Sequence, residues 1–142
     1  MIQRQKALAW ACASIPVLLA IRADGNGPPK VLSGPARAVL TVTTNALPTT
    51  STSQVQIRSG TLEPGSSTAW HTHPSPPFVY IVSGTGTWEY KDGRNAETRS
   101  GGEAIMEPAN VTTRVVNRAK TPLSFVLFQV SKPGEPVIVP AR

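Results

Sequence analysis

The 142-residue sequence has one cysteine, Cys12, two histidines and few charged side chains. A single cysteine cannot form a disulfide within the chain, which excludes a disulfide-stapled fold. Charged residues make up 15% of the sequence, whereas about 25% is usual for soluble domains. The length allows one domain, or one domain with an appendage, and excludes two full domains.

Leucine is also scarce, whereas valine and threonine are numerous, and the chain contains 11 glycines and 14 prolines. This composition argues against a helical bundle and predicts an all-β fold of short strands joined by tight turns. Turn signals recur about every 8–12 residues, a spacing typical of a sandwich or barrel. The expected strands cover residues 38–43, 55–58, 67–72, 78–83, 85–90, 97–100, 104–107, 112–117, 123–131 and 136–140.

Residues 1–23 form a separate unit in the sequence. A basic start is followed by an uncharged apolar run of 15 residues, Ala7 to Ile21. This pattern is typical of a secretory signal peptide, and the run is shorter than the roughly 20 residues that span a bilayer. We therefore expect export to the periplasm or the medium, without stable membrane insertion once the signal is cleaved. An uncleaved membrane anchor and a buried helix are the alternatives.

The formal charge of +6 belongs in part to this targeting segment. Residues 1–23 carry three basic and no acidic side chains, so the rest of the chain has 11 basic and 8 acidic residues, a net charge of +3. No basic helix or basic cluster is present, and we expect no nucleic-acid partner. The sequence also lacks a phosphate-binding loop, a dinucleotide fingerprint and a serine nucleophile elbow.

The only two histidines, His71 and His73, stand two residues apart in an expected strand. Side chains at i and i+2 of a strand lie on the same face, so the two imidazoles should point together. Imidazole is a ligand for several divalent transition metals, which makes this pair a candidate metal site. The alternative is a pair of hydrogen-bonding histidines near a strand end.

Two stretches around these histidines resemble the signature motifs of the cupin superfamily. The first is Gly65-(five residues)-His71-Thr-His73, which continues to Gly84, and the second covers residues 102–117. The resemblance spans about residues 55–131 and implies a double-stranded β-helix, also called a jelly-roll barrel, with a site inside its mouth. We divide the chain into a signal peptide (1–23), an N-terminal linker and strand (24–54) and a cupin domain (55–140).

The sequence departs from the metal-ligand set that the resemblance implies. Cupin sites typically use two His and a Glu from the first motif and a third His from the second. The Glu position is Pro77 here, and the second-motif His position is Thr113. Asn110 replaces a usual glycine, a tolerable change because Asn also adopts a positive φ.

A carboxylate from elsewhere can complete the set. Glu107 stands beside the second-motif strand and is the first candidate, while Glu89 and Glu103 are weaker ones. If no carboxylate reaches the histidines, two neutral imidazoles and water would hold a divalent ion only weakly. We expect Trp70, Phe78, Tyr80 and Thr113 to line the ligand pocket, although strand aromatics more often pack in a core.

The leading functional hypothesis is an exported small-molecule-binding cupin with a weak or incomplete metal site at His71 and His73. Its cofactor would be a divalent metal ion of unknown identity. The first alternative, by family resemblance, is a metal-dependent enzyme, dioxygenase- or isomerase-like, that acts on a small oxygenated substrate. The second is a structural or dimerisation module, since the resemblance also makes a homodimer a candidate.

Overall fold

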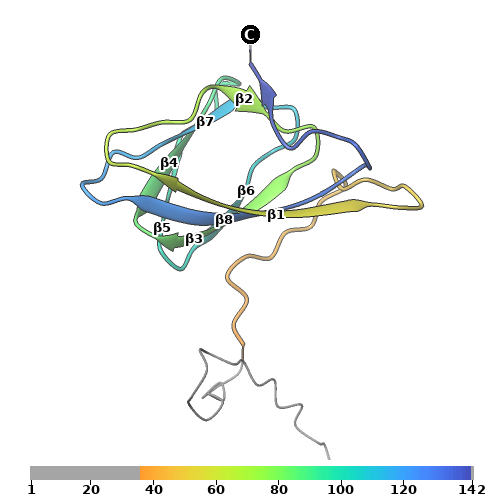
Figure 1. The fold of residues 1–142 in the computed structure, drawn as a ribbon, viewed down its shortest axis with the longest axis horizontal. Coiled ribbons are helices and arrows are strands. Elements are labelled where there is room, and N and C mark those ends of the chain that lie inside the picture. The colour runs from red at the N-terminus through yellow and green to blue at the C-terminus, as the bar shows by residue number, and fades with distance from the viewer. Residues whose placement is uncertain (1–35, 142) are drawn as a thin grey trace, which may run out of the picture. The chain divides into compact units, whose positions relative to one another are not determined.

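The computed structural model describes residues 36–141, which form nine β-strands (Figure 1). No helix among these residues is long or apolar enough to cross a membrane. The predicted signal peptide and residues 24–35 lie outside the described residues, so export stays a prediction. The strands are β1 (Gln54–Leu62), β2 (His71–Thr72), β3 (Pro77–Ser83), β4 (Thr85–Tyr90), β5 (Glu97–Ser100), β6 (Ala104–Met106), β7 (Thr113–Val116), β8 (Leu123–Ser131) and β9 (Val139–Pro140).

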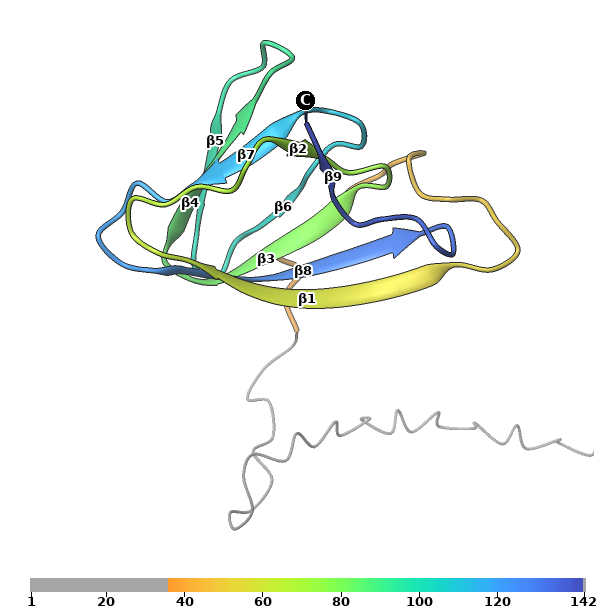
Figure 2. The same cartoon turned by 45° about the horizontal axis from the view of Figure 1, so that its top comes forward.

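The strands make two antiparallel sheets that lie against each other (Figures 1 and 2). One sheet has the strand order β1-β8-β3-β6 and the other has the order β5-β4-β7-β2-β9. The chain crosses from one sheet to the other at each connection except the β4–β5 hairpin. This arrangement confirms the predicted all-β class and the double-stranded β-helix architecture.

The core lies between the inner faces of the two sheets. Val79 and Ile81 of β3 and Leu123 of β8 are at most 1% exposed, and they meet the buried Trp88 of β4. Alternate residues of the same strands face outward, as the two-residue period of a strand requires. Only every second side chain of a strand can therefore reach the interior.

Most strand boundaries follow the sequence prediction, and β4, β5 and β8 agree with it to the residue. The expected strand at 67–72 is shorter, because only His71 and Thr72 form β2. Upstream of them, the backbone amide of Val115 donates to the hydroxyl of Thr68 instead of to a backbone carbonyl. The side chain thus occupies the place of a ladder bond, and only a single bridge between Ser67 and Val116 remains.

The prediction of a strand at residues 38–43 is wrong. The segment has no strand conformation and pairs with no strand among the described residues, and Val39 and Val42 are 46% and 38% exposed. A run of β-branched residues favours an extended chain, but a strand also needs a neighbouring strand whose hydrogen-bonding edge is available.

Two turn residues of the motifs have a positive φ, and for Asn110 this confirms the expectation. Asn110 has a φ of 59°, which is the left-handed conformation expected where it replaces a glycine. Gly84 has a φ of 81° and lies so close to Pro122 that a β-carbon would overlap the Pro122 carbonyl oxygen. Gly84 is therefore required both for its backbone conformation and for lack of space.

We expect Gly84→Ala to lower the free energy of unfolding by about 3–5 kcal/mol, because backbone strain and a steric overlap add together. Gly93→Ala is the matched control, since Gly93 also has a positive φ, of 87°, but has no atom within 4 Å of the added carbon. The control should lose only about 1–2 kcal/mol from strain. Urea denaturation measures both values, and equal losses in the two variants would contradict the steric argument.

Candidate metal centre

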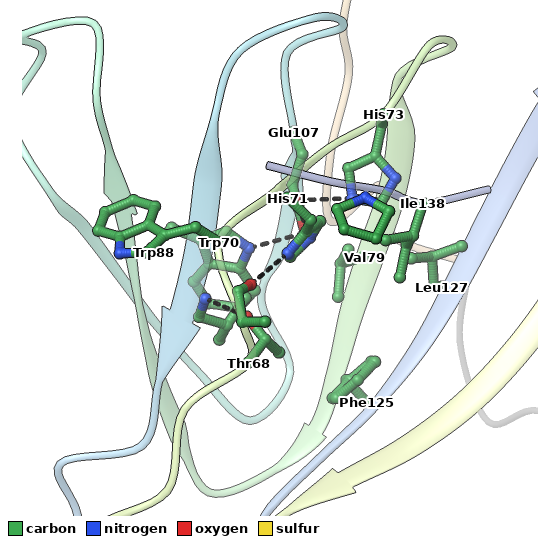
Figure 3. Close-up of a pocket in the computed structure, with 13 residues that line it drawn as sticks. Thr68, Trp70, His71, His73, Val79, Trp88, Glu107, Phe125, Leu127 and Ile138 are labelled. Carbon is green, nitrogen blue, oxygen red and sulfur yellow. Dashed lines mark hydrogen bonds and ion pairs between the residues drawn. The ribbon is translucent and has the colours of Figure 1, made fainter. Parts of the chain in front are cut away.

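The two histidines point into the barrel side by side, as their spacing predicts (Figure 3). Their ring centroids lie 4.9 Å apart with the rings nearly perpendicular. His71 belongs to β2 and pairs with Thr113 of β7, whereas His73 follows directly after β2. His71 is 6% and His73 1% exposed, so both imidazoles are removed from bulk water.

A carboxylate reaches both imidazoles, and it is that of Glu107. Its Oε2 atom lies 3.1 Å from Nε2 of His73 and 3.9 Å from Nε2 of His71. Glu107 follows β6, and its backbone amide donates to the carbonyl of Pro77. The carboxylate therefore enters from the strand next to the position where the family motif would place a glutamate.

Backbone carbonyls fix the tautomer of each histidine. Nδ1 of His71 lies 2.8 Å from the carbonyl oxygen of Ala69, and Nδ1 of His73 lies 2.6 Å from that of Val137. A carbonyl only accepts hydrogen bonds, so each Nδ1 must carry the proton. In a neutral imidazole the Nε2 atom then presents a lone pair, and both lone pairs face Glu107.

The indole of Trp88 completes the support of the carboxylate. Its Nε1 donates to Oε1 of Glu107 over 2.9 Å, which leaves Oε2 directed at the histidines. Within residues 36–141, neither Oε2 of Glu107 nor Nε2 of His73 has a hydrogen-bond partner, although both are buried. Two acceptors 3.1 Å apart without a donor are unfavourable, so the geometry calls for a cation, either a proton or a metal ion, between them.

The three side chains form the one cluster of candidate metal ligands found among residues 36–141, with their ligand atoms within 4.8 Å of one another. Ligand atoms that each lie about 2.0–2.2 Å from one ion are separated by about 3–4 Å. The two nitrogen–oxygen distances agree with that separation. The arrangement thus fits an ion held by two imidazoles and one carboxylate.

Glu89 and Glu103 take no part in this cluster. Arg114 donates to Glu89 over 2.7 Å, and this hydrogen bond lowers the pKa of the Glu89 carboxyl below its ordinary value. Glu103 accepts a hydrogen bond from the backbone amide of Ser100 and so closes a turn. Arg114 also lies over the ring of Trp70, 4.7 Å from its centroid.

A cavity of about 250 Å³ opens beside the three candidate ligands (Figure 3). Apart from the ligands, its walls are almost entirely apolar, and no lysine or arginine lines it. The lining residues are Thr68, Ala69, Trp70, His71, His73, Val79, Trp88, Glu107, Val115, Phe125, Leu127, Ile138 and Pro140.

Three of the four expected pocket residues lie elsewhere. Trp70 lines the cavity, whereas Phe78 and Tyr80 do not, because they are among the alternate residues of β3 that face away from the core. Phe78 packs against Phe128 on the outer side of the sheet, and Tyr80 is 42% exposed. Thr113 is fully buried in the ladder beside His71, and its hydroxyl lies within hydrogen-bond distance of the carbonyl of Val111.

Sequence reasoning missed the apolar wall formed by Phe125, Leu127 and Ile138. The parity of β3 offered a signal, because position 77 corresponds to a ligand position in the motif and so must face inward. Residues 79 and 81 then face inward too, and their antiparallel partners Leu127 and Phe125 lie on the same face. Ile138 carried no such signal, since it belongs to a C-terminal segment beyond both motifs.

The chain matches the family model described as a cupin domain over residues 59–129, which is half of its length. No curated protein matches it. Solved structures that resemble it include a double-stranded beta-helix protein from Klebsiella pneumoniae, with 18% identity and a TM-score of 0.52 over 62% of this chain and 75% of that one.

Two enzymes share the same fold. The oxalate decarboxylase of Lactobacillus farciminis, in complex with formate, has 18% identity and a TM-score of 0.53 over 61% of this chain and 26% of that one. The DMSP lyase DddQ of Ruegeria pomeroyi has 14% identity and a TM-score of 0.54 over 61% and 43%. This chain thus spans less than half the length of either enzyme.

The opposed acceptors generate a prediction about the metal-free protein. Glu107→Gln keeps an oxygen for Trp88 and adds an amide that can donate to Nε2 of His73. In excess chelator at pH 8, this variant should be more stable than the wild type by about 1–3 kcal/mol, because a donor replaces one of two opposed acceptors. Urea denaturation measures the difference.

Glu63→Gln is the control, because Glu63 is an exposed glutamate remote from the centre. It should change the free energy of unfolding by less than about 0.5 kcal/mol. A Glu107→Gln variant that is less stable than the chelated wild type would show that the carboxylate and imidazole are not two opposed acceptors.

Proposed function

The chain belongs to the cupin domain family, and on that premise we propose that it binds a small molecule at a divalent metal ion held by His71, His73 and Glu107. The observation that carries this proposal is the pair of buried, unpartnered acceptors, Nε2 of His73 and Oε2 of Glu107. A metal ion between them relieves the repulsion of the lone pairs and accounts for the burial of all three side chains.

The support around the three ligands favours a metal ion over a shared proton. Each imidazole is held through Nδ1 by a backbone carbonyl, and the carboxylate is held by the indole of Trp88. Such outer contacts orient metal ligands and raise the basicity of ligating imidazoles. A single proton needs only one donor–acceptor pair, whereas here three ligands converge on one point.

Two imidazoles and one carboxylate are a donor set that suits several ions, among them Zn²⁺, Fe²⁺, Ni²⁺, Cu²⁺ and Mn²⁺. Three protein ligands leave at least one coordination position free. Such an open position is typical of catalytic rather than structural zinc sites. The apolar cavity next to the ligands is where a bound molecule would reach that position.

The open position also favours a second candidate function, that of a metal-dependent enzyme. A divalent ion with a free position polarises a bound oxygen atom and lowers the pKa of bound water. The chain's own contribution would be to orient the molecule against the walls, to exclude water from the cavity and to fix both imidazole tautomers. The reaction class is left open, because one fold hosts many chemistries.

Metal binding is tested by equilibrium dialysis of chelator-treated protein against Zn²⁺, Co²⁺ and Ni²⁺. We expect one equivalent of metal in the wild type and an affinity at least about 100-fold lower in His73→Ala and in Glu107→Gln, since each loses one of three ligands. Zn²⁺ at 100 times its dissociation constant should also raise the free energy of unfolding by about 2.7 kcal/mol.

Glu63→Gln serves again as the control and should bind metal as the wild type does. His73→Ala removes a buried side chain and can unfold the protein, so Glu107→Gln, which preserves volume, is the decisive variant. A wild type that emerges from dialysis without metal, or a Glu107→Gln variant with unchanged affinity, would overturn the proposed function.

We also propose that two copies of the chain associate through the outer face of the sheet that contains β1. We call this surface the outer apolar face, and its exposed large side chains are Val55, Ile57, Tyr80, Val82 and Phe128. Ile57, the most prominent of them, is 69% exposed and pairs across the ladder with Phe128. No member carries a charge, so two copies of a basic chain can bring these faces together without like-charge repulsion.

The position of β1 supports the same partner. β1 is nine residues long and lies at the edge of its sheet, and within residues 36–141 only β8 pairs with it (Figure 2). A long edge strand whose outer side chains include the exposed Val55 and Ile57 is a place where another chain can add. A second copy offers the same edge and the same face about a two-fold axis.

Ile57→Lys should convert a dimer to a monomer, because it replaces the most exposed member of the outer apolar face with a side chain that carries an ammonium group. Sedimentation velocity over a range of protein concentrations measures the oligomeric state. Thr98→Lys is the charge-matched control on β5 of the other sheet, and it should remain dimeric. A monomeric wild type, or dissociation by both substitutions alike, would contradict this interface.

A further inference from the structure

The walls of the cavity restrict the chemistry of the molecule that can occupy it. From them we infer that the cavity takes a monoanion, such as a monocarboxylate or a phenolate, whose single charged donor is joined to an apolar body about the size of one aromatic ring. This inference rests on the proposed function, because it needs the ion at His71, His73 and Glu107. It goes further by assigning the ligand class.

The charge of the metal centre limits the charge of the molecule that can bind there. An imidazole that keeps its proton on Nδ1 and binds an ion through Nε2 is a neutral ligand, so a divalent ion with two such imidazoles and one carboxylate carries a formal charge of +1. The cavity contains no other charged side chain. One negative charge on the ligand neutralises the centre, whereas a second would be buried with no cation to pair with, which is strongly unfavourable.

The walls offer few hydrogen-bonding groups to a bound molecule. The indole of Trp88 already donates to Glu107, and the hydroxyl of Thr68, which accepts from the amide of Val115, has only its own O–H left to donate. A polar substituent far from the ion would lose its water and find few partners. The body of the ligand should therefore be hydrocarbon.

The volume of the cavity and the composition of its walls limit the size of the ligand's apolar body. A dry apolar cavity of about 150 Å³ holds benzene, and this cavity measures about 250 Å³, which leaves room for a ring together with its acid group. Val79, Phe125 and Leu127 provide branched and aromatic contacts on the side of the four-stranded sheet. Ile138 and Pro140 of the C-terminal segment provide another part of the wall.

That segment, residues 132–141, makes Ile138 a specificity-determining residue. It lies beyond the part of the chain that matches the family model, and β9 within it pairs with β2. The carbonyl of Val137 accepts from His73, and the next side chain, Ile138, lines the cavity while remaining 46% exposed. Ile138 thus lies at the mouth, where it can cover the apolar body of a bound molecule.

The test compares four probes by isothermal titration on protein whose zinc content has been measured by dialysis. Benzoate has the inferred charge and body, acetate lacks the ring, phthalate adds a second negative charge, and benzyl alcohol lacks the charge. Benzoate should bind about 100-fold more tightly than acetate, the ratio expected from burial of one ring. It should also bind at least about 10-fold more tightly than phthalate or benzyl alcohol.

Ile138→Ala should weaken benzoate about 10-fold, since it removes part of the wall, and should leave acetate and zinc affinity unchanged. Val39→Ala, at an exposed valine outside both the cavity lining and the outer apolar face, is the control and should alter neither. Zinc-loaded wild type that binds acetate or phthalate as tightly as benzoate would overturn the ligand class and leave the metal site standing. Wild type that takes up no zinc would overturn both.

Discussion

The central constraint in the structure is the repulsion between the lone pairs of two buried acceptors, Nε2 of His73 and Oε2 of Glu107, which lie 3.1 Å apart. Three contacts orient the side chains of the site. The carbonyl of Val137 accepts from His73 and the indole of Trp88 donates to the Glu107 carboxylate, while the carbonyl of Ala69 accepts from the neighbouring His71. None of the three gives either acceptor a proton. The surrounding fold therefore maintains an arrangement that is unfavourable until a cation occupies it, as expected of a preorganised metal site.

The carboxylate shows how sheet pairing can preserve a site when its usual residue is lost. The motif position for a glutamate, at the start of β3, is Pro77, which has no ligand atom. β6 pairs with β3, and the amide of Glu107 at the end of β6 bonds to the carbonyl of Pro77. A side chain at position 107 therefore starts next to position 77 and reaches the same space. Among residues 36–141, no histidine, cysteine, aspartate or glutamate joins the cluster in place of Thr113, which lies in the ladder.

Much of the fold follows from the sequence, because turn residues and two-residue periodicity indicate where most of the strands begin and end. Three strands agree to the residue, and the positive φ of Asn110 follows from its place in the motif. The failure at residues 38–43 has a physical reason: strand formation depends on a partner edge, which the segment itself does not encode. The same distinction applies to the site, where some contacts follow from local spacing and others depend on which strands pair.

Within the site, the meeting of His71 and His73 follows from their spacing, while the reach of Glu107 depends on which strands become neighbours. Side chains alternate between the two faces of β3. If residue 77 faces inward, Phe78 and Tyr80 must face outward. Aromatic character alone says nothing about direction. The contribution of Ile138 had no sequence signal at all, because its place over the cavity results from β9 pairing with β2, a contact between segments far apart in the chain.

Similarity of fold does not carry the chemistry of the enzymes that share it, and the cavity shows why. Identities of 14–18% leave the wall residues free to differ while the two sheets keep their arrangement. The centre and the walls impose separate conditions: the ligand set fixes the charge that a bound molecule must supply, and the apolar wall fixes what the rest of that molecule can be. A molecule that meets only the first condition, such as a small monoanion without an apolar body, would reach the proposed ion but leave the wall at Phe125 and Leu127 uncovered. The two conditions together select for one charged end and one apolar end, a requirement set by side chains that the common fold leaves variable.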